Sequence, residues 1–489
     1  MYDAALTRPT GRSVSPRQLA DLLHDLPASR PMYRNLAKAI RTLVLEGRLA
    51  LQIRLPAERE LAGELALSRP TVTAAYDLLR ESGYASSRRG AGTWTTLPGG
   101  QRAAGSRRTL TSENESIDLL SAALGLPDDA INGALNDSAP LLALHARAPG
   151  YHPFGLMELR KAVAERYTRR GVPTLPDQIL ITSGAQQGLA LSLGLLATPG
   201  DRVMIENPTY PNALDAVRRA RLRLTPIPVS ETGWNSDVMN ATLAQAMPRM
   251  AYVIPDFQNP VGCLMPAEQR RELLHATRRT GTWLVVDETL TDIALDVPPP
   301  APFVSHSPSQ ETEHVITVGS MSKSFWGGLR IGWLRATPRL ITKLAELRVG
   351  MDMAGSVMDQ LLSVALLART EEILQPRLTQ IRHQRDTLLA ALHEHLPQWT
   401  TPVPAGGLTL WVDLGQTIAS AVADQVLTKG VRIEGGARFG ADPGTHDHRL
   451  RIPYTLPPDL LQEAVRRLAA VLDGGLPLTD TAPSPHWVT

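Results

Sequence analysis

Residues 315–333 read VITVGSMSKSFWGGLRIGW, an apolar run followed by a lysine-bearing turn. The run is short and rich in β-branched residues, which predicts a buried strand at residues 315–318. Lys323 follows that strand. Burial and nearby positive charge would lower the pKa of its amine and make it nucleophilic. Ser320 and Arg330 flank Lys323 and both suit a phosphate, although a loop lysine with serines at turns is an alternative interpretation.

Further short apolar runs alternate with longer helical patterns along the same part of the chain. They lie at residues 179–182, 252–254 and 283–286. Short buried strands separated by helices predict an α/β domain with a largely parallel sheet. The last third returns to long helical patterns and then strands at residues 408–412 and 450–453, which predicts a smaller α+β lobe.

Polar residues follow these apolar runs, at positions where one ligand would contact several of them. Residues 183–186 read SGAQ between a strand and an apolar helix, so their backbone amides would form an anion site. Asp287 ends another run, and a buried carboxylate there needs a cationic partner, which a protonated pyridine nitrogen would supply.

An amide and an aromatic ring complete this set. Asn259, in FQNPVG, has an amide able to bond a ring hydroxyl, and Tyr210, in ENPTYP, offers a plane for stacking. Each residue also has an ordinary structural interpretation as a helix cap, a satisfied core acid, a turn or a core aromatic. Their common position at the carboxyl ends of strands favours a shared site.

The front segment has a different pattern. Leu36, Ile40, Leu43 and Val44 share one helical face, and Ser68 is a suitable N-cap for a later helix. A glycine-containing hairpin with arginines at its turn follows. Residues 30–95 contain eleven basic and six acidic residues, an excess of five that is typical of phosphate binding. We therefore expect a compact domain at residues 30–96, after an N-terminal extension (residues 1–29) and before a linker (residues 97–116).

The string RLPAERELAGELALSRPTVTAAYDLLRESGYASSRRGAGTW (residues 54–94) resembles the winged helix-turn-helix of GntR-type transcription regulators. Pro70 stands where many members have a small polar residue, which removes one backbone donor to a phosphate. The resemblance implies these DNA-contacting residues: Arg59, Ser68, Arg69, Thr71, Arg88, Arg89 and Gly90.

Residues 117–475 resemble a fold-type I, pyridoxal-phosphate-dependent aminotransferase domain, and the whole chain resembles a MocR-type regulator. The resemblance implies an internal aldimine at Lys323, a ring-nitrogen contact from Asp287, a ring-oxygen contact from Asn259 and stacking by Tyr210. The implied phosphate ligands are Gly184, Ala185, Gln186, Ser320, Arg330 and Tyr151, the last donated by a neighbouring subunit. Arg451 matches the arginine that clamps a substrate carboxylate, with Arg449 two residues away as the other choice.

One departure bears on activity. Many members carry a tyrosine two or three residues after the aspartate, whereas Asp287 is followed by Glu288, Thr289 and Leu290. Loss of that phenol would slow proton shuttling but spare cofactor binding. The resemblance therefore favours a homodimeric DNA-binding regulator that senses an amine or amino acid through aldimine formation. An active aminotransferase with a DNA-binding head, and a sensor of pyridoxal phosphate itself, are the alternatives.

Composition is consistent with this reading. The chain has 489 residues, a formal net charge of +2 and one cysteine, Cys263, so it has no intramolecular disulfide and fits a reducing compartment. Its first residues have no apolar core of signal-peptide length, and its longest apolar stretch is too short for a membrane span. We expect a cytoplasmic protein. Residues 446–448 (HDH) lie in a Gly/Pro/Asp-rich loop and are expected to be solvated rather than metal-binding.

Overall fold

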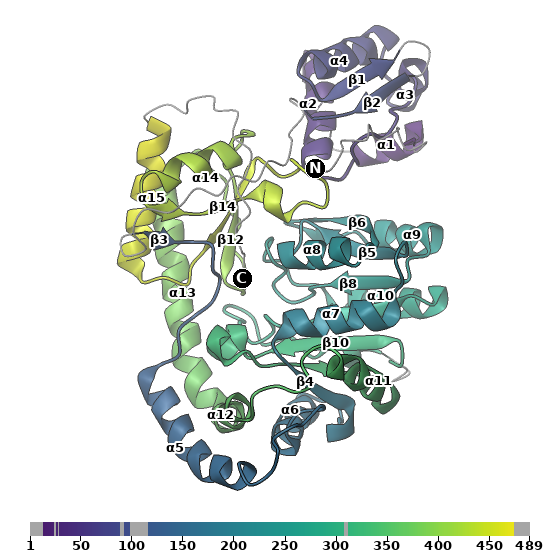
Figure 1. The fold of residues 1–489 in the computed structure, drawn as a ribbon. Coiled ribbons are helices and arrows are strands. Elements are labelled where there is room, and N and C mark those ends of the chain that lie inside the picture. The colour runs from purple at the N-terminus through teal and green to yellow at the C-terminus, as the bar shows by residue number, and fades with distance from the viewer. Residues whose placement is uncertain are drawn as a thin grey trace, which may run out of the picture.

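The computed structural model describes residues 13–23, 26–27, 29–88, 92–97, 116–307 and 312–473. Figure 1 shows an N-terminal head in purple, a large sheet domain in blue and green, and a smaller C-terminal lobe in yellow-green. The head lies beside the C-terminal lobe and one edge of the large sheet. This arrangement confirms the predicted fold class, a winged helix-turn-helix joined to a mixed α/β domain.

The head is built around one apolar cluster. Helix α2 (Met32–Leu45) buries the predicted face of Leu36, Ile40, Leu43 and Val44. Ser68 caps α4 (Arg69–Glu81), the recognition helix of the head, because its hydroxyl accepts a hydrogen bond from the Thr71 amide. The other elements of the head are α1 (Pro16–Leu22), α3 (Glu58–Glu64), β1 (Ala85–Arg88) and β2 (Gly92–Thr95).

Part of the N-terminal extension belongs to this head. Leu19 and Leu23 are buried in the same cluster as the helices that follow them. Ser15 caps α1, and its hydroxyl accepts the Gln18 amide. The described part of the predicted N-terminal extension therefore contains a helix that packs into the head.

The large domain is centred on an eight-stranded sheet among the described residues, in the order β4-β11-β10-β9-β8-β5-β6-β7. The central pairs are parallel, whereas β11 and β7 run antiparallel to their neighbours. The strands are β4 (Ile179–Thr182), β5 (Arg202–Asn207), β6 (Arg223–Ser230), β7 (Gly233–Trp234), β8 (Met250–Val253), β9 (Trp283–Asp287), β10 (Val315–Ser320) and β11 (Gly332–Arg335).

Helices cover both faces of this sheet, which explains why its strands read as continuous apolar runs. Successive strand residues alternate between two clusters: Ile179 and Ile181 enter one, and Leu180 enters the other. The first cluster is covered by α6 (Met157–Arg169), α9 (Ser236–Ala246), α10 (Ala267–Thr280) and α12 (Val357–Ala368). The second is covered by α7 (Ala185–Leu196), α8 (Pro211–Arg219) and α11 (Pro338–Val349).

The smaller lobe carries a three-stranded sheet in the order β12-β15-β14. Its strands are β12 (Thr409–Asp413), β14 (Glu434–Gly435) and β15 (Arg449–Pro453). Its helices are α14 (Ala419–Leu427) and α15 (Pro458–Asp473), and the long α13 (Thr370–His395) and α5 (Asp128–His145) lead from it to the large domain. After the linker, β3 (Ile117–Asp118) joins this lobe by pairing with β13 (Val431–Arg432).

No helix in the described ranges is both long enough and apolar enough to span a bilayer.

Candidate functional site

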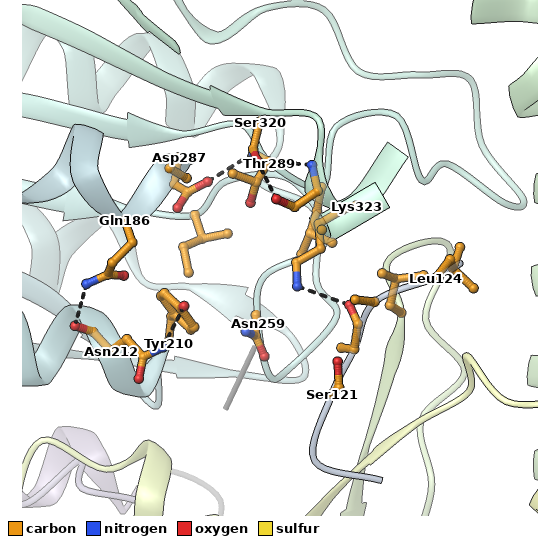
Figure 2. Close-up of a pocket in the computed structure, with 18 of the residues that line it drawn as sticks. Ser121, Leu124, Gln186, Tyr210, Asn212, Asn259, Asp287, Thr289, Ser320 and Lys323 are labelled. Atoms are coloured by element: carbon orange, nitrogen blue, oxygen red, sulfur yellow. Dashed lines mark hydrogen bonds between the residues drawn. The ribbon is translucent and has the colours of Figure 1, made fainter. Parts of the chain in front are cut away.

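A cavity of about 650 Å³ opens at the carboxyl ends of the central strands. Figure 2 shows polar side chains from several strands and loops turned toward it. The predicted residues that line it are Lys323, Asp287, Asn259, Tyr210, Ala185, Gln186, Ser320 and Arg330. The cavity therefore brings together most of the set that the sequence pointed to.

Lys323 lies on a single π-helical turn, Ser322–Trp326, directly after β10. Its Nζ donates to the carbonyl of Ala122 at 3.0 Å (Figure 2). Burial lowers the pKa of this amine to about 8, and the charge of Arg451 acts in the same direction, while Asp287 opposes both. A far larger fraction of the amine is therefore unprotonated near neutral pH than for a surface lysine.

Asp287 ends β9 and is held by two donors. The phenol of Tyr252 donates to one carboxylate oxygen at 2.6 Å, and the Thr289 amide donates to the other at 2.9 Å. Burial raises the pKa of Asp287, and these hydrogen bonds and the charge of Lys323 oppose the rise. The sequence analysis did not single out Tyr252. A tyrosine inside an apolar strand was the available signal, because a buried phenol needs a partner.

The end of the cavity near α7 is shaped to receive an anion. Gly184 caps α7 with a φ of +84°, and Ala185 and Gln186 at the start of this helix line the cavity, where the unpaired amides of a first turn favour an anion. A Cβ on Gly184 would lie 2.9 Å from the guanidinium of Arg330, which donates to the Ser183 carbonyl at 3.1 Å. Ser320 at the end of β10 pairs with Gly332 of β11.

Tyr210, Asn212 and Gln186 form a short hydrogen-bonded row along one wall (Figure 2). Asn212 donates to the phenol oxygen of Tyr210 at 2.8 Å, and Gln186 donates to the Asn212 carbonyl at 3.2 Å. Gln186 Oε1 and Asn259 Oδ1 are buried and have no hydrogen-bond partner within the described part of the chain. Such atoms are costly unless a ligand or water satisfies them.

Arg451 is near this cavity but does not line it. Its side chain is fully buried, its Nη2 donates to the Leu120 carbonyl, and its guanidinium carbon lies 5.2 Å from the centre of the Phe439 ring. Its Nε and Nη1 have no partner among the described residues. Residues 121–125 do line the cavity, so this strap (residues 119–125), missed by the sequence analysis, contacts both Lys323 and Arg451.

Arg449, the other candidate for a carboxylate clamp, is occupied elsewhere. It makes ion pairs with Glu231 at 2.5 Å and Asp413 at 3.2 Å. Tyr151 also lies outside the cavity, with 66% of its surface exposed. Thr289 and Leu290 line the cavity after Asp287, so a threonine and a leucine occupy the two positions at which the phenol was expected.

The expectation that residues 446–448 are solvated is wrong. His446, Asp447 and His448 are all buried. The His446 amide donates to the Leu45 carbonyl at the end of α2, and the Asp447 carboxylate accepts the Ser420 amide at 2.9 Å. Burial lowers the pKa of His446 to about 3, so its imidazole is neutral near pH 7. Across the ranges that the structure describes, no cluster of three or more His, Cys, Asp or Glu side chains could hold a metal ion.

The predicted DNA-contacting face is exposed on the head. Arg59, Ser68 and Arg69 are exposed, and Thr71 is half-buried beside them. Glu58 positions two neighbours on this face: it lies 4.0 Å from Arg69, and its carboxylate accepts the Thr73 hydroxyl at 2.7 Å. The backbone of Arg88 ends β1, whereas Arg89 and Gly90 lie outside the described residues.

Two family models match the chain. Residues 122–468 match aminotransferase class I and II, and residues 32–94 match bacterial regulatory proteins, gntR family. The second segment covers the head from α2 onward, and the first covers Lys323, Asp287, Asn259 and Tyr210 of the cavity.

Several known proteins are similar over most of their length. The probable rhizopine catabolism regulatory protein MocR of Rhizobium meliloti is 30% identical over 410 residues, covering 78% of this chain and 81% of that protein. The uncharacterized HTH-type transcriptional regulator YisV of Bacillus subtilis is 27% identical, covering 87% of this chain and 92% of that protein.

Among solved structures, the α-aminoadipate aminotransferase LysN of Thermus thermophilus, complexed with N-(5'-phosphopyridoxyl)-L-leucine, is 30% identical with a TM-score of 0.66. The match covers 73% of this chain and 92% of LysN. The chain therefore belongs to the aminotransferase class I and II family, and it carries a gntR-family DNA-binding domain, the combination found in MocR-type transcription regulators.

Proposed function

We propose that this DNA-binding regulator holds pyridoxal phosphate on Lys323 and senses an amine or amino acid in the same cavity. The observation that carries the proposal is the amine of Lys323, with its pKa lowered to about 8, in a cavity that also contains Asp287 and Asn259. When bound, the cofactor supplies an electrophilic aldehyde and an electron-withdrawing ring.

The cavity residues fit this group. Asn259 and Gln186 each present a buried oxygen that lacks a partner in the described chain, and each also has an amide for a ring or phosphate oxygen. At Gly184 a side chain would fill the space beside Arg330, so glycine keeps the anion cradle open. The open cradle and the N–H donors of the two side-chain amides support binding of a planar ligand that carries an anionic group.

Individual residues then have distinct tasks. Lys323 would attach the cofactor through its unprotonated amine. Asp287, fixed by the Tyr252 phenol and the Thr289 amide, would hold a proton on the ring nitrogen. Tyr210 would stack on the ring, and the α7 amides (Gly184, Ala185, Gln186) with Ser320 and Arg330 would bind the phosphate.

Arg451 binds the carboxylate of an amino-acid effector in this proposal. Its Nε lacks a partner among the described residues, and Nε together with Nη2 is the pair of N–H groups that can donate in parallel to a carboxylate. The Leu120 carbonyl already accepts from Nη2, so entry of an effector carboxylate requires the strap to shift. An amine without a carboxylate would leave that contact intact.

Leu290 favours sensing over turnover. Because Thr289 and Leu290 stand where many family members have a phenol, a bound ring oxygen would have the Asn259 amide as a donor but would lack that proton-exchanging phenol. Aminotransferase activity is the second candidate function, favoured by the presence of Lys323, Asp287 and Arg451 together.

We also propose a cytoplasmic homodimer. Tyr151 is exposed outside its own cavity, as expected if it completes the phosphate site of a second copy. Leu144 on α5 and Met351 and Met353 after α11 are large apolar side chains that are also exposed. A second copy would cover such a surface.

One experiment tests the cofactor assignment. The protein is incubated with pyridoxal phosphate, reduced with borohydride and mapped by peptide mass spectrometry, with Lys323→Ala as the control. We expect one phosphopyridoxyl group on Lys323 and none in the variant. Modification spread over surface lysines, with no preference for Lys323, would refute the assignment. Multiple-turnover assays with a panel of amino acids then separate sensing from transamination.

A further inference from the structure

The end of α2 in the head is capped by the small lobe. The last carbonyls of any helix lack partners within that helix. The carbonyl of Leu45, the final residue of α2, accepts the backbone amide of His446 at 2.7 Å. A second contact joins the Tyr84 phenol to the Thr417 hydroxyl at 3.4 Å. The head is therefore hydrogen-bonded to the effector domain and is not held by the linker alone.

Gly47 allows this close approach. It has a φ of +65°, and a Cβ there would lie 2.1 Å from Nδ2 of Asn207. Asn207 ends β5 in the large domain. Its Oδ1 accepts from the neutral imidazole of His446 at 3.2 Å and from the Ala441 amide at 3.0 Å. One asparagine thus lies against the head, against the 436–448 loop, and three residues before Tyr210 of the cavity.

The 436–448 loop connects this contact to the effector site. Phe439 lies under the guanidinium of Arg451, and its carbonyl accepts the Thr209 amide at 3.0 Å. The loop closes tightly on itself, because a Cβ on Gly436 would lie 2.2 Å from the His446 carbonyl. Because the loop is tightly packed, we expect a displacement of Phe439 to move His446 as well.

We propose that the 436–448 loop is the element that transmits effector binding to the head, with His446 and Gly47 as the contact across the two domains. This inference rests on the proposed binding of a carboxylate at Arg451. A carboxylate that draws Arg451 away from Phe439 removes a support of the loop. The His446 amide then releases the Leu45 carbonyl, and α2 moves with the rest of the head. An effector that bound both arrangements of this contact equally well would leave the position of the head unchanged.

Hydrogen exchange of the His446 amide measures this contact directly. The full-length protein is compared alone, with N-(5'-phosphopyridoxyl)-L-leucine, the compound present in the LysN structure, and with the matching phosphopyridoxyl isopentylamine, which lacks the carboxylate. We expect the leucine adduct to raise the exchange rate of the His446 amide by about tenfold, because the free energy needed to open its hydrogen bond falls when the loop is loosened. The isopentylamine adduct should leave the exchange rate within about twofold.

Two glycine variants provide a matched pair. Gly47→Ala adds a Cβ against Asn207, whereas Gly281→Ala imposes the same backbone strain (φ of +67°) with no atom within 4 Å of the new Cβ. We expect Gly47→Ala to raise exchange at His446 before any ligand is added and to abolish the further response. Gly281→Ala should behave as wild type, with circular dichroism confirming that both variants fold.

Two results would overturn the proposal. The first is a leucine adduct that binds, as followed by its absorbance, yet leaves exchange at His446 unchanged. The second is a folded Gly47→Ala protein with wild-type exchange at His446. Failure of both adducts to bind is a different result, because it refutes the proposed function and, with it, the signal that this loop would carry.

Discussion

Tyr252 and Asp287 meet across adjacent parallel strands, where the phenol of the tyrosine donates to the carboxylate of the aspartate at 2.6 Å. Tyr252 on β8 lies opposite Val285 on β9, two residues before Asp287, so the contact follows from the strand register. The phenol is fully buried, and burial together with the nearby carboxylate raises its pKa well above the usual range. It therefore stays protonated and keeps donating to Asp287.

Tyr252→Phe should weaken cofactor binding. Removing the hydroxyl leaves one oxygen of Asp287 without its donor, at a cost of about 1–3 kcal/mol. We expect the dissociation constant for pyridoxal phosphate, measured by fluorescence titration, to rise by roughly tenfold. Tyr454→Phe is the control, because that buried phenol donates to the Gly406 carbonyl in the small lobe. Equal affinity in Tyr252→Phe and wild type would contradict the role of this hydrogen bond.

Attachment of pyridoxal phosphate to Lys323 should depend on pH with a midpoint near 8. Only the unprotonated amine attacks, and burial with the charge of Arg451 lowers the pKa of Lys323 from 10.5 to about 8. Below that pH the amine is protonated and attachment slows; above it the rate levels off. Arg451→Gln removes a positive charge and should shift the midpoint upward, as followed by stopped-flow absorbance. A wild-type midpoint near 10 would show that the amine is solvated.

Arg69→Ala should weaken binding to a DNA duplex selected from a random library by the wild-type protein. Arg69 is exposed at the first turn of the recognition helix and is oriented by Glu58. If it reads a base, we expect a loss of about 1–3 kcal/mol by fluorescence anisotropy, and less discrimination against nonspecific DNA. Arg466→Ala on α15 is the charge-matched control. An unchanged affinity and salt dependence in Arg69→Ala would place the reading surface elsewhere.

Leu290→Tyr should increase transaminase turnover. The substitution puts a phenol at the cavity wall after Asp287, where an acid or base near the ring oxygen is lacking. General acid–base groups contribute about 10²–10⁴-fold to such steps, and we expect at least tenfold in kcat with the best amino acid of a panel. Leu290→Phe supplies the same ring without the hydroxyl. A gain of the same size in Leu290→Phe would assign the effect to shape and not to proton transfer.

The strands and their polar ends could be read from the sequence because local chemistry dictates them. Residues 179–182 form a strand with the predicted bounds, and Lys323 and Asp287 lie at strand ends that converge in the cavity. The pattern of Leu36, Ile40 and Val44 likewise predicted the buried face of α2. In each case the signal was local, either a periodic spacing of apolar residues or the point at which a strand ends.

The remaining features depend on contacts between distant segments. Leu120 and Ala122 carry no chemical signal in their side chains, since their backbone carbonyls make the contacts with Arg451 and Lys323. His446 looked solvated because its loop is rich in Gly, Pro and Asp, but distant segments bury it: its amide donates to Leu45 of α2 and its imidazole contacts Asn207 of β5. Backbone acceptors and domain docking leave little trace in residue composition.

The large sheet is covered by helices on both faces, so its strand residues are constrained by packing to stay apolar. The part of the cavity wall that is free of this constraint lies on the strap and on the short turn around Trp326 and Gly327, which line the cavity without belonging to the sheet. In evolutionary terms, the scaffold and the choice of ligand are separable. A gene for such a regulator can acquire a new effector through a few substitutions in two short cavity-lining segments, while the attached reading head and the folding core are inherited unchanged.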